Sequence, residues 1–284
     1  NTSGELNTAV GSLALDASTT GNHNTALGYG VLSENTTASF NTGVGSQVLD
    51  AATTASANTG VGYAALSAAT TGGNNTAVGT NALLVNTTGT SNVAVGSSAL
   101  DSNTTASNCT AVGFSALTSN TTGYDNNAFG SASLDTNTTG FRNQAFGVSA
   151  LQANTTGEVN NAFGYAALYT LSTGTGNTAM GQAAGFAVTT GSNNLLLGQD
   201  AGRSSSPSGS VTTANNTVCL GNSSISAAHI QVAFQTGSDQ RDKTDITDFN
   251  FGLDWINKMR PVTYRWDNRD WYDNRTPDGS KKAP

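Results

Sequence analysis

Acidic side chains are the most numerous chemically active groups in residues 1–237, but they are few and irregularly spaced. This part of the chain holds nine acids and only two bases, Arg142 and Arg203, so the whole formal charge of −7 falls within it. Hydrolysis of a glycosidic bond needs two carboxyl groups that face each other across a cleft. Nine acids scattered at unrelated spacings do not predict such a pair, and the sequence argues against a polysaccharide-degrading enzyme here.

The two cysteines, Cys109 and Cys219, are the next candidates for chemistry. They are isolated in the sequence and match neither a zinc-ligand motif nor a disulfide framework. If each repeat described below forms one coil that rises about 4.8 Å, their sulfur atoms lie roughly 30 Å apart, which is beyond disulfide reach. We therefore expect two buried free thiols, and we expect neither a bound metal nor a cofactor.

The last 47 residues contain a different set of reactive side chains. The segment begins Ser238-Asp239-Gln240-Arg241-Asp242-Lys243-Thr244-Asp245-Ile246, continues through Arg260-Pro261-Val262-Thr263-Tyr264, and approaches its end with Asp278-Gly279-Ser280-Lys281-Lys282. It resembles the intramolecular chaperone domain of endosialidase-type phage tailspikes, which opens with the pattern S-D-x-R-x-K-x-x-I. That domain is longer than this segment, so we expect residues 238–284 to be the N-terminal part of an α+β chaperone domain.

This resemblance implies that the chain cleaves itself. In the family the first Ser is the nucleophile and the Lys five residues later assists it. Here this implies Ser238 and Lys243 as catalytic residues and a cut between Gly237 and Ser238. The chemistry is sound because a Lys whose pKa is lowered by burial can accept the proton of a Ser hydroxyl. No histidine is required, and both His23 and His229 lie outside the motif.

A 17-residue repeat organises the chain upstream of this segment. Relatives of Asn-Thr-Ala-Val-Gly begin at residues 7, 24, 41, 58, 75, 92, 109, 126, 143, 160, 177 and 194. The consensus is N-T-A-φ-G-x-x-A-L-x-x-N-T-T-G-x-x, in which φ is apolar, and we number its positions from one to seventeen. Position five is Gly in all twelve copies. Such regular self-similarity predicts a stack of similar structural units.

One repeat is long enough for a coil of a β-solenoid and too short for a helical hairpin. Positions one to four and the Thr-rich positions twelve to fourteen favour two strands, while the segment between them fits either a strand or one helical turn. We expect the apolar residues at positions four and nine to form the core, with Phe129, Phe146 and Phe163 stacked in successive coils. Asn at position one predicts a ladder of side-chain amides along the axis.

The N-x-A-φ-G part of the repeat also resembles the head repeats of trimeric autotransporter adhesins, and this implies three parallel β-rolls packed about a threefold axis. The composition agrees, because each coil has few large apolar residues to offset the entropy of ordering seventeen residues. Small residues at positions three and eight would let neighbouring chains approach closely. The sequence therefore predicts an all-β, parallel homotrimeric β-solenoid.

Three segments follow from these patterns. Residues 1–203 form the repeat array, which starts in the middle of a repeat, so we expect more fibre upstream. Residues 204–237 form an irregular last coil and junction: six residues are inserted within 203–216, Pro207 marks a loop, and a last imperfect repeat begins at Thr217. Residues 238–284 are the chaperone segment. Six Asn-Thr-Thr sequons fall at one repeat position, and we expect them to be structural and unglycosylated: Asn35, Asn86, Asn103, Asn120, Asn137 and Asn154.

Near-identical repeats create a problem of alignment between chains. Each coil resembles its neighbours, so three chains can pair one repeat out of step, and poorly specified register leads to mispairing and aggregation. A C-terminal domain that trimerises first would align the chains before the repeats pack. Its removal by cleavage would leave the fibre kinetically trapped.

Charge and hydropathy exclude several classes of partner. An acidic body with two bases lacks the basic footprint of a nucleic-acid-binding protein, and no apolar run is long enough to span a bilayer. Together with the two resemblances, the sequence predicts a structural fibre of a phage tail, located in the virion, that binds a glycan or protein receptor on the host surface. Further tail proteins would bind upstream. The alternative is a bacterial cell-surface or secreted adhesin-like fibre.

Overall fold

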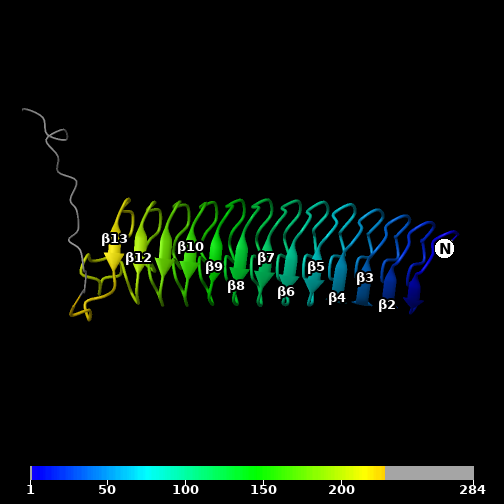
Figure 1. The fold of residues 1–284 in the computed structure, drawn as a ribbon, viewed down its shortest axis with the longest axis horizontal. Coiled ribbons are helices and arrows are strands. Elements are labelled where there is room, and N and C mark those ends of the chain that lie inside the picture. Colours follow the sequence, from blue (N-terminus) through cyan, green and yellow to red (C-terminus); the bar gives the residue numbers. More distant parts are fainter. Residues whose placement is uncertain (1, 228–284) are drawn as a thin grey trace, which may run out of the picture. The chain divides into compact units, whose positions relative to one another are not determined.

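A computed structural model describes residues 2–227, which belong to one compact unit of the chain. They form a parallel β-solenoid in which each coil contributes one strand to a single sheet (Figure 1). The strands are β1 (Thr8–Val10), β2 (Thr25–Tyr29), β3 (Thr42–Ser46), β4 (Thr59–Tyr63), β5 (Thr76–Val78), β6 (Val93–Val95), β7 (Thr110–Val112), β8 (Asn127–Phe129), β9 (Gln144–Phe146), β10 (Asn161–Phe163), β11 (Thr178–Met180), β12 (Leu195–Leu197) and β13 (Val218–Leu220). The described residues contain no helix, and so none that could cross a membrane.

The thirteen strands follow one another in sequence order, and all neighbours are parallel. Each residue pairs with the residue at the same repeat position in the next coil, as Ala111 does with Ala128 and Val112 with Phe129. The hydrogen bonds between strands therefore run along the axis of the solenoid. The predicted strand at positions one to four is confirmed, although the strands begin at position two.

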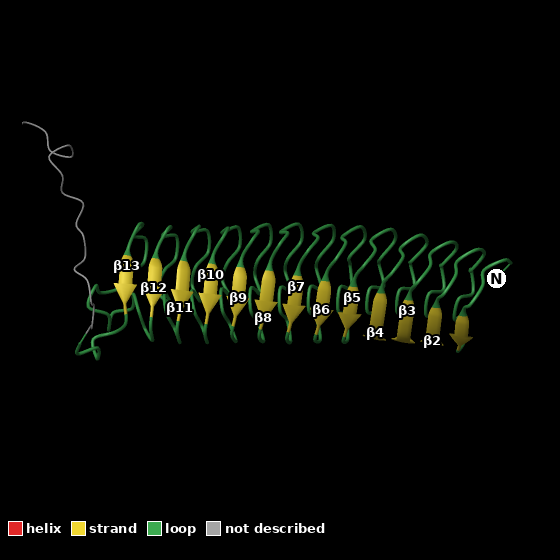
Figure 2. Cartoon of the chain, viewed as in Figure 1, coloured by secondary structure: helices red, strands yellow, loops and turns green. Residues whose placement is uncertain are grey.

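The rest of each coil consists of turns and bends (Figure 2). Positions six to eleven, for which the sequence left two alternatives, form a turn in which Leu at position nine is left-handed, as at Leu117 with a φ of 54°. Positions twelve to fourteen form a bend, so the second predicted strand is wrong. There, the backbone amides of Thr121 and Thr122 both donate to the carbonyl of Thr138 in the next coil. Two successive amides that point at one acceptor bend the chain instead of extending it.

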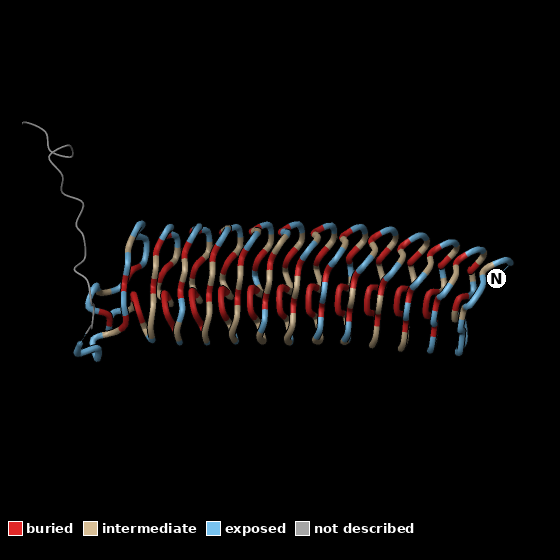
Figure 3. The backbone as a smooth tube through the Cα atoms, viewed as in Figure 1, coloured by how far each residue is buried: buried red, intermediate tan, exposed pale blue. Residues whose placement is uncertain are grey.

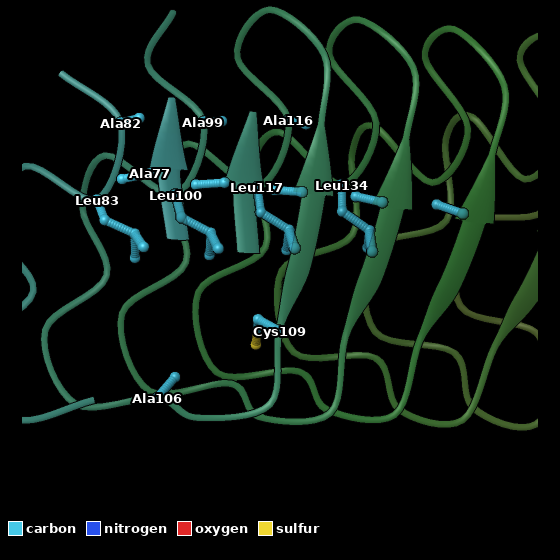
Figure 4. Packing of buried hydrophobic residues seen from close by; sticks show 14 of the residues in the cluster. Ala77, Ala82, Leu83, Ala99, Leu100, Ala106, Cys109, Ala116, Leu117 and Leu134 are labelled. Carbon is cyan, nitrogen blue, oxygen red and sulfur yellow. The ribbon is translucent and has the colours of Figure 1, made fainter. Parts of the chain in front are cut away.

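Buried segments recur at the same places in successive coils (Figure 3). The buried residues are mainly small apolar residues, Asn and one Leu per coil. Leu83, Leu100, Leu117 and Leu134 at position nine form a column along the axis, as the sequence predicted (Figure 4). From the second coil to the twelfth, positions three and eight, which are mostly Ala, also point inward and are buried. The expectation that these small residues form a face for neighbouring chains is therefore wrong, because they fill the interior of a narrow coil.

Two buried columns of Asn connect the coils. At position one, the backbone amide of Asn143 donates to Oδ1 of Asn126 at 2.9 Å, and Nδ2 of Asn143 donates to the carbonyl of Gly157 at 2.8 Å. At position twelve, Nδ2 of Asn137 donates to Oδ1 of Asn120 at 2.8 Å. The predicted amide ladder is confirmed, and a second one exists at the sequon position. All six sequon Asn residues are fully buried, which explains the triplet by structure.

The predicted place of position four is wrong. Neighbouring residues of a strand face opposite sides of the sheet, and Ala at position three is the residue that faces inward. Position four therefore lies on the outer face, where Val95 is 36% exposed and Phe129 is 37% exposed. An interior that already holds Leu from position nine has room only for a small side chain at position three.

Position five requires Gly for two reasons, the backbone conformation and the close contact with the next coil. Gly113 has a φ of +139°, which L side chains rarely adopt. A Cβ at this position would lie 2.6 Å from the carbonyl atoms of Gly130 in the next coil. The strand can therefore leave the sheet at this point only if the residue has no side chain.

The last coil departs from the repeat. Leu195 of β12 pairs with Val218 of β13, and hydrogen bonds across this coil join residues 23 apart instead of 17, which confirms the six-residue insertion. The extra residues form a loop, with Pro207 exposed, that is closed by a hydrogen bond from the Val211 amide to the Gly202 carbonyl at 2.8 Å. The predicted loop and the last imperfect repeat are both confirmed.

Candidate functional site

The outer face of the sheet carries an unbroken column of apolar side chains at position four. We call this column the apolar ridge: Val10, Leu27, Val44, Val61, Val78, Val95, Val112, Phe129, Phe146, Phe163, Met180, Leu197 and Leu220. The strand register places each member directly beside the next, from Val10 with Leu27 to Leu197 with Leu220. Position two also faces outward and is mostly Thr. The ridge therefore extends through all thirteen coils of the described chain.

The ridge is partly exposed to solvent along its length. Its members are half-buried or exposed, and the most exposed in the central and C-terminal coils are Met180, at 52%, and Leu220, at 51%. The thirteen side chains thus form one contiguous apolar surface along the sheet. Contiguous exposed apolar surfaces mark interaction sites, whereas scattered single apolar residues do not.

Three aromatic rings stack within the ridge, as the sequence predicted. The ring centroids of Phe129 and Phe146 lie 4.8 Å apart, and those of Phe146 and Phe163 lie 4.9 Å apart, with interplanar angles of 8° and 4°. These separations follow from the spacing of neighbouring strands. The stacking was predicted for the interior, and the structure places it on the outer face.

Charged side chains avoid the face of the sheet. No Asp, Glu, Lys or Arg occupies positions one to six of any repeat, and the two described bases lie elsewhere. Arg142 lies over the rings of Tyr124 and Phe141 and is 3.6 Å from Asp125. Interface centres are depleted of charge in the same way. The ridge therefore combines apolar surface with the absence of groups that would be costly to desolvate.

The two cysteines are buried free thiols, as predicted. Burial raises the pKa of Cys109 to about 11, so this thiol is protonated at neutral pH. Its Sγ lies 3.3 Å from the carbonyl of Gly123, and the Sγ of Cys219 lies 2.7 Å from Oγ of Ser206. A protonated thiol inside the coil is a poor nucleophile and a poor metal ligand.

The carboxylates do not gather in a cleft. Asp50, Asp101 and Asp135 share position ten but lie on coils separated by two or three repeats, and burial raises the pKa of each. Two shallow pockets lie near the C-terminal coils, between Gly176 and Ile225, and neither has a carboxylate, a cysteine or a histidine in its lining. Within residues 2–227, no three His, Cys, Asp or Glu side chains come together as a metal site would require.

The residues that the sequence assigned to self-cleavage lie outside the described part of the chain. These are Ser238, Lys243 and the Gly237–Ser238 bond. The ridge, in contrast, was not predicted from the sequence to be an exposed surface. The sequence does carry a signal for the ridge: in the first eleven repeats position three is always small, and position four next to it is always a larger apolar residue. Such alternation indicates that the two positions face opposite sides of the sheet.

Comparisons with known proteins bear on the C-terminal segment. Residues 238–281 match a family model described as chaperone of endosialidase. The match begins at Ser238 and includes Lys243. No curated protein and no solved structure matches the chain.

Proposed function

We propose that this chain is the shaft of a homotrimeric phage tail fibre or tailspike, with a C-terminal chaperone that directs trimerisation and then cleaves itself off. The observation that carries the proposal is the apolar ridge, an uncharged surface as long as the solenoid itself. The family match at residues 238–281 supports it, because a chaperone for assembly follows this surface in the sequence. In the virion the shaft would extend towards the host and present a surface for a glycan or protein receptor.

A further copy of the same chain is the partner that the ridge fits best. The ridge presents one apolar side chain per coil, with the spacing of neighbouring β-strands. A partner that buries every member must present apolar groups with the same spacing over the same length. Another copy of the solenoid, parallel and with its own ridge turned inward, meets this condition. Three copies around a common axis would cover each ridge from both sides and leave the opposite faces of the coils in solvent.

The chaperone segment would act once per chain. Oγ of Ser238 attacks the carbonyl carbon of Gly237 while Lys243 accepts the hydroxyl proton. Lys243 then passes this proton to the departing Ser238 nitrogen, and the acyl group moves from that nitrogen to the oxygen. Water then hydrolyses this ester, which leaves a carboxylate on Gly237 and frees Ser238 as a new N-terminus. This is a maturation step and not turnover of a substrate. The match of this segment to a chaperone family supports these roles.

Charged substitutions on the ridge test the proposal. In the full chain, Val78→Lys combined with Val95→Lys should leave the β-structure intact but yield monomers, because six ammonium groups would have to be desolvated at the axis of a trimer. The matched control is Thr88→Lys with Thr105→Lys, which adds the same charge to the same coils on an exposed face away from the sheet. The association state is measured by sedimentation velocity and the fold by far-ultraviolet circular dichroism. A wild-type chain that sediments as a folded monomer would refute the proposal, as would an unchanged trimer in the ridge variant.

A further inference from the structure

Three consecutive strands differ from all others on their outer face. Strands β8, β9 and β10 read Asn-Ala-Phe, Gln-Ala-Phe and Asn-Ala-Phe. In the other ten strands position two is Thr, Val or Leu, and position four is Val, Leu or Met. Both outward positions therefore change together, over the same three coils. We call these six side chains the aromatic block: Asn127, Phe129, Gln144, Phe146, Asn161 and Phe163.

The solenoid itself does not require this change. The inward residues Ala128, Ala145 and Ala162 are fully buried, as is Ala111 in the preceding strand. The strand register is also unchanged through the block. The interior is therefore the same on both sides of the boundary, and the difference lies only on the surface that the proposed trimer covers.

The aromatic block is an ordered surface. Its three rings stack in series at 4.8 and 4.9 Å. Nδ2 of Asn127 donates to Oε1 of Gln144 at 2.8 Å, so two of the three amides beside the rings are also connected between coils. Such a surface holds its side chains in fixed positions before a partner arrives, which lowers the entropy cost of packing against it.

We propose that the aromatic block sets the axial register between the chains of the fibre, an inference that rests on the proposed trimer. From Val44 to Val112 the ridge consists of Val in five successive strands, so a slip of one coil between chains replaces Val by Val. At the block the same slip places Phe129 of one chain beside Val112 of its neighbour, and Phe163 beside Met180. One level is then overfilled and another is left with a void, and both faults reduce the stability of a packed interface.

The aromatic block and the chaperone segment would act at different stages of assembly. A C-terminal domain aligns the chains at the start of assembly, but its influence ends when it is cut off. A register signal within the shaft remains afterwards. Its central strand, β9, lies three coils from β12, so the block can correct a slip that arises while the coils pack.

A chain with a transposed block tests this inference. The changes Thr110→Asn, Val112→Phe, Asn161→Thr and Phe163→Val move the three rings, each still beside an amide, by one coil towards the N-terminus and leave every inward residue unchanged. Full-length wild-type and transposed chains carry different affinity tags and are co-expressed. Mixed trimers are isolated by sequential purification on both tags and counted by native mass spectrometry.

Two reference mixtures make the outcomes distinguishable. Two differently tagged wild-type chains should mix at the statistical ratio, and two differently tagged transposed chains should do the same. Wild-type and transposed chains together should give roughly tenfold fewer mixed trimers, since a mismatch at two levels costs at least about 1.4 kcal/mol. Statistical mixing of wild-type with transposed chains would overturn the register role while leaving the trimer intact. Absence of association between the wild-type chains would refute the trimer and this inference together.

The transposed chain must itself assemble for this comparison. If its own two tagged forms do not mix, the opposite transposition replaces it: Asn127→Thr, Phe129→Val, Thr178→Asn and Met180→Phe. This variant moves the block one coil towards the C-terminus and is measured against the same references. Its segregation from wild-type chains supports the inference, and its free mixing overturns it.

Discussion

Replacing Gly113 with Ala tests how strongly the solenoid depends on the close approach of its coils. Gly113 combines a φ of +139° with a carbonyl of the next coil that lies 2.6 Å from where a Cβ would be. The backbone conformation alone costs about 1–3 kcal/mol for a residue other than Gly. Relief of the contact requires a shift of backbone, which costs a further 1–3 kcal/mol or so. We therefore expect Gly113→Ala to lower the free energy of unfolding by about 2–6 kcal/mol per chain.

Gly30 provides a matched control within the same chain. It also has a positive φ, of +60°, but no atom lies within 4 Å of where its Cβ would be. Gly30→Ala should therefore cost only the conformational strain, about 1–2 kcal/mol. The difference between the two variants therefore reports the contact between coils together with the larger backbone strain at a φ of +139°.

The assay is equilibrium denaturation in guanidinium chloride, followed by circular dichroism. All variants are compared at one protein concentration, because association makes apparent stability depend on concentration. In a repeat array the loss is concentrated at one interface between neighbouring coils, so the Gly113→Ala variant should also show a new site of limited proteolysis near coils seven and eight. Equal destabilisation by the two substitutions would show that the coils are not in the close contact described, and the reasoning would fail.

Two further predictions concern pH and processing. Burial raises the pKa of Asp101 above its usual value of 3.8, so the folded state favours the protonated carboxyl. The stability that this protonated carboxyl contributes is present below pH 3.8 and is lost as the pH rises through the pKa of the folded state. Asp101→Asn should therefore stabilise the chain at pH 7, by less than about 1 kcal/mol because the group is partly solvated, and should give no gain near pH 3 in thermal melts; a loss of stability at pH 7 would contradict the sign. In a full-length protein, Ser238→Ala should abolish release of the C-terminal segment while trimers still form, and Lys243→Ala should act nearly as strongly, since the hydroxyl loses its proton acceptor. Product masses on denaturing gels decide this, and unchanged cleavage in Ser238→Ala would exclude it as the nucleophile.

The sequence was sufficient for the parts of the fold that depend on spacing. The 17-residue period predicted one coil per repeat, position nine predicted the Leu column seen at Leu100 and Leu117, and Asn at position one predicted the amide ladder. Thr at positions twelve to fourteen misled the strand prediction, because β-branched residues favour strands only where the backbone is free to extend. There the hydroxyl of Thr121 also donates to the carbonyl of Thr138, at 3.0 Å, which adds a third donor to the bend.

Position four shows where reasoning from hydrophobicity failed. An apolar side chain is equally suited to the interior of one coil and to an interface between chains, so residue type alone did not separate the two. In the interior, where the sequence predicted Phe146, a change to Asp would bury an unpaired charge and destabilise the coil. Because Phe146 lies on the outer face, the same change should instead weaken association and leave each coil folded. For Ser238 and Lys243 the expectation came from family resemblance, which the match at 238–281 supports at the level of the segment.

The direction of the hydrogen bonds determines how the shaft bears load. Strands lie across the axis, and bonds such as that from the Leu117 amide to the Ser133 carbonyl run along it, so a pull on the two ends stretches every bond between two adjacent coils at once. Coils carry such a force in series, and the shaft is therefore as strong as its weakest junction. The loop-bearing last coil, where the 17-residue spacing is lost between β12 and β13, is the natural place for rupture to begin. The eleven regular coils would then remain intact upstream, so failure under tension would shorten the shaft without unravelling it.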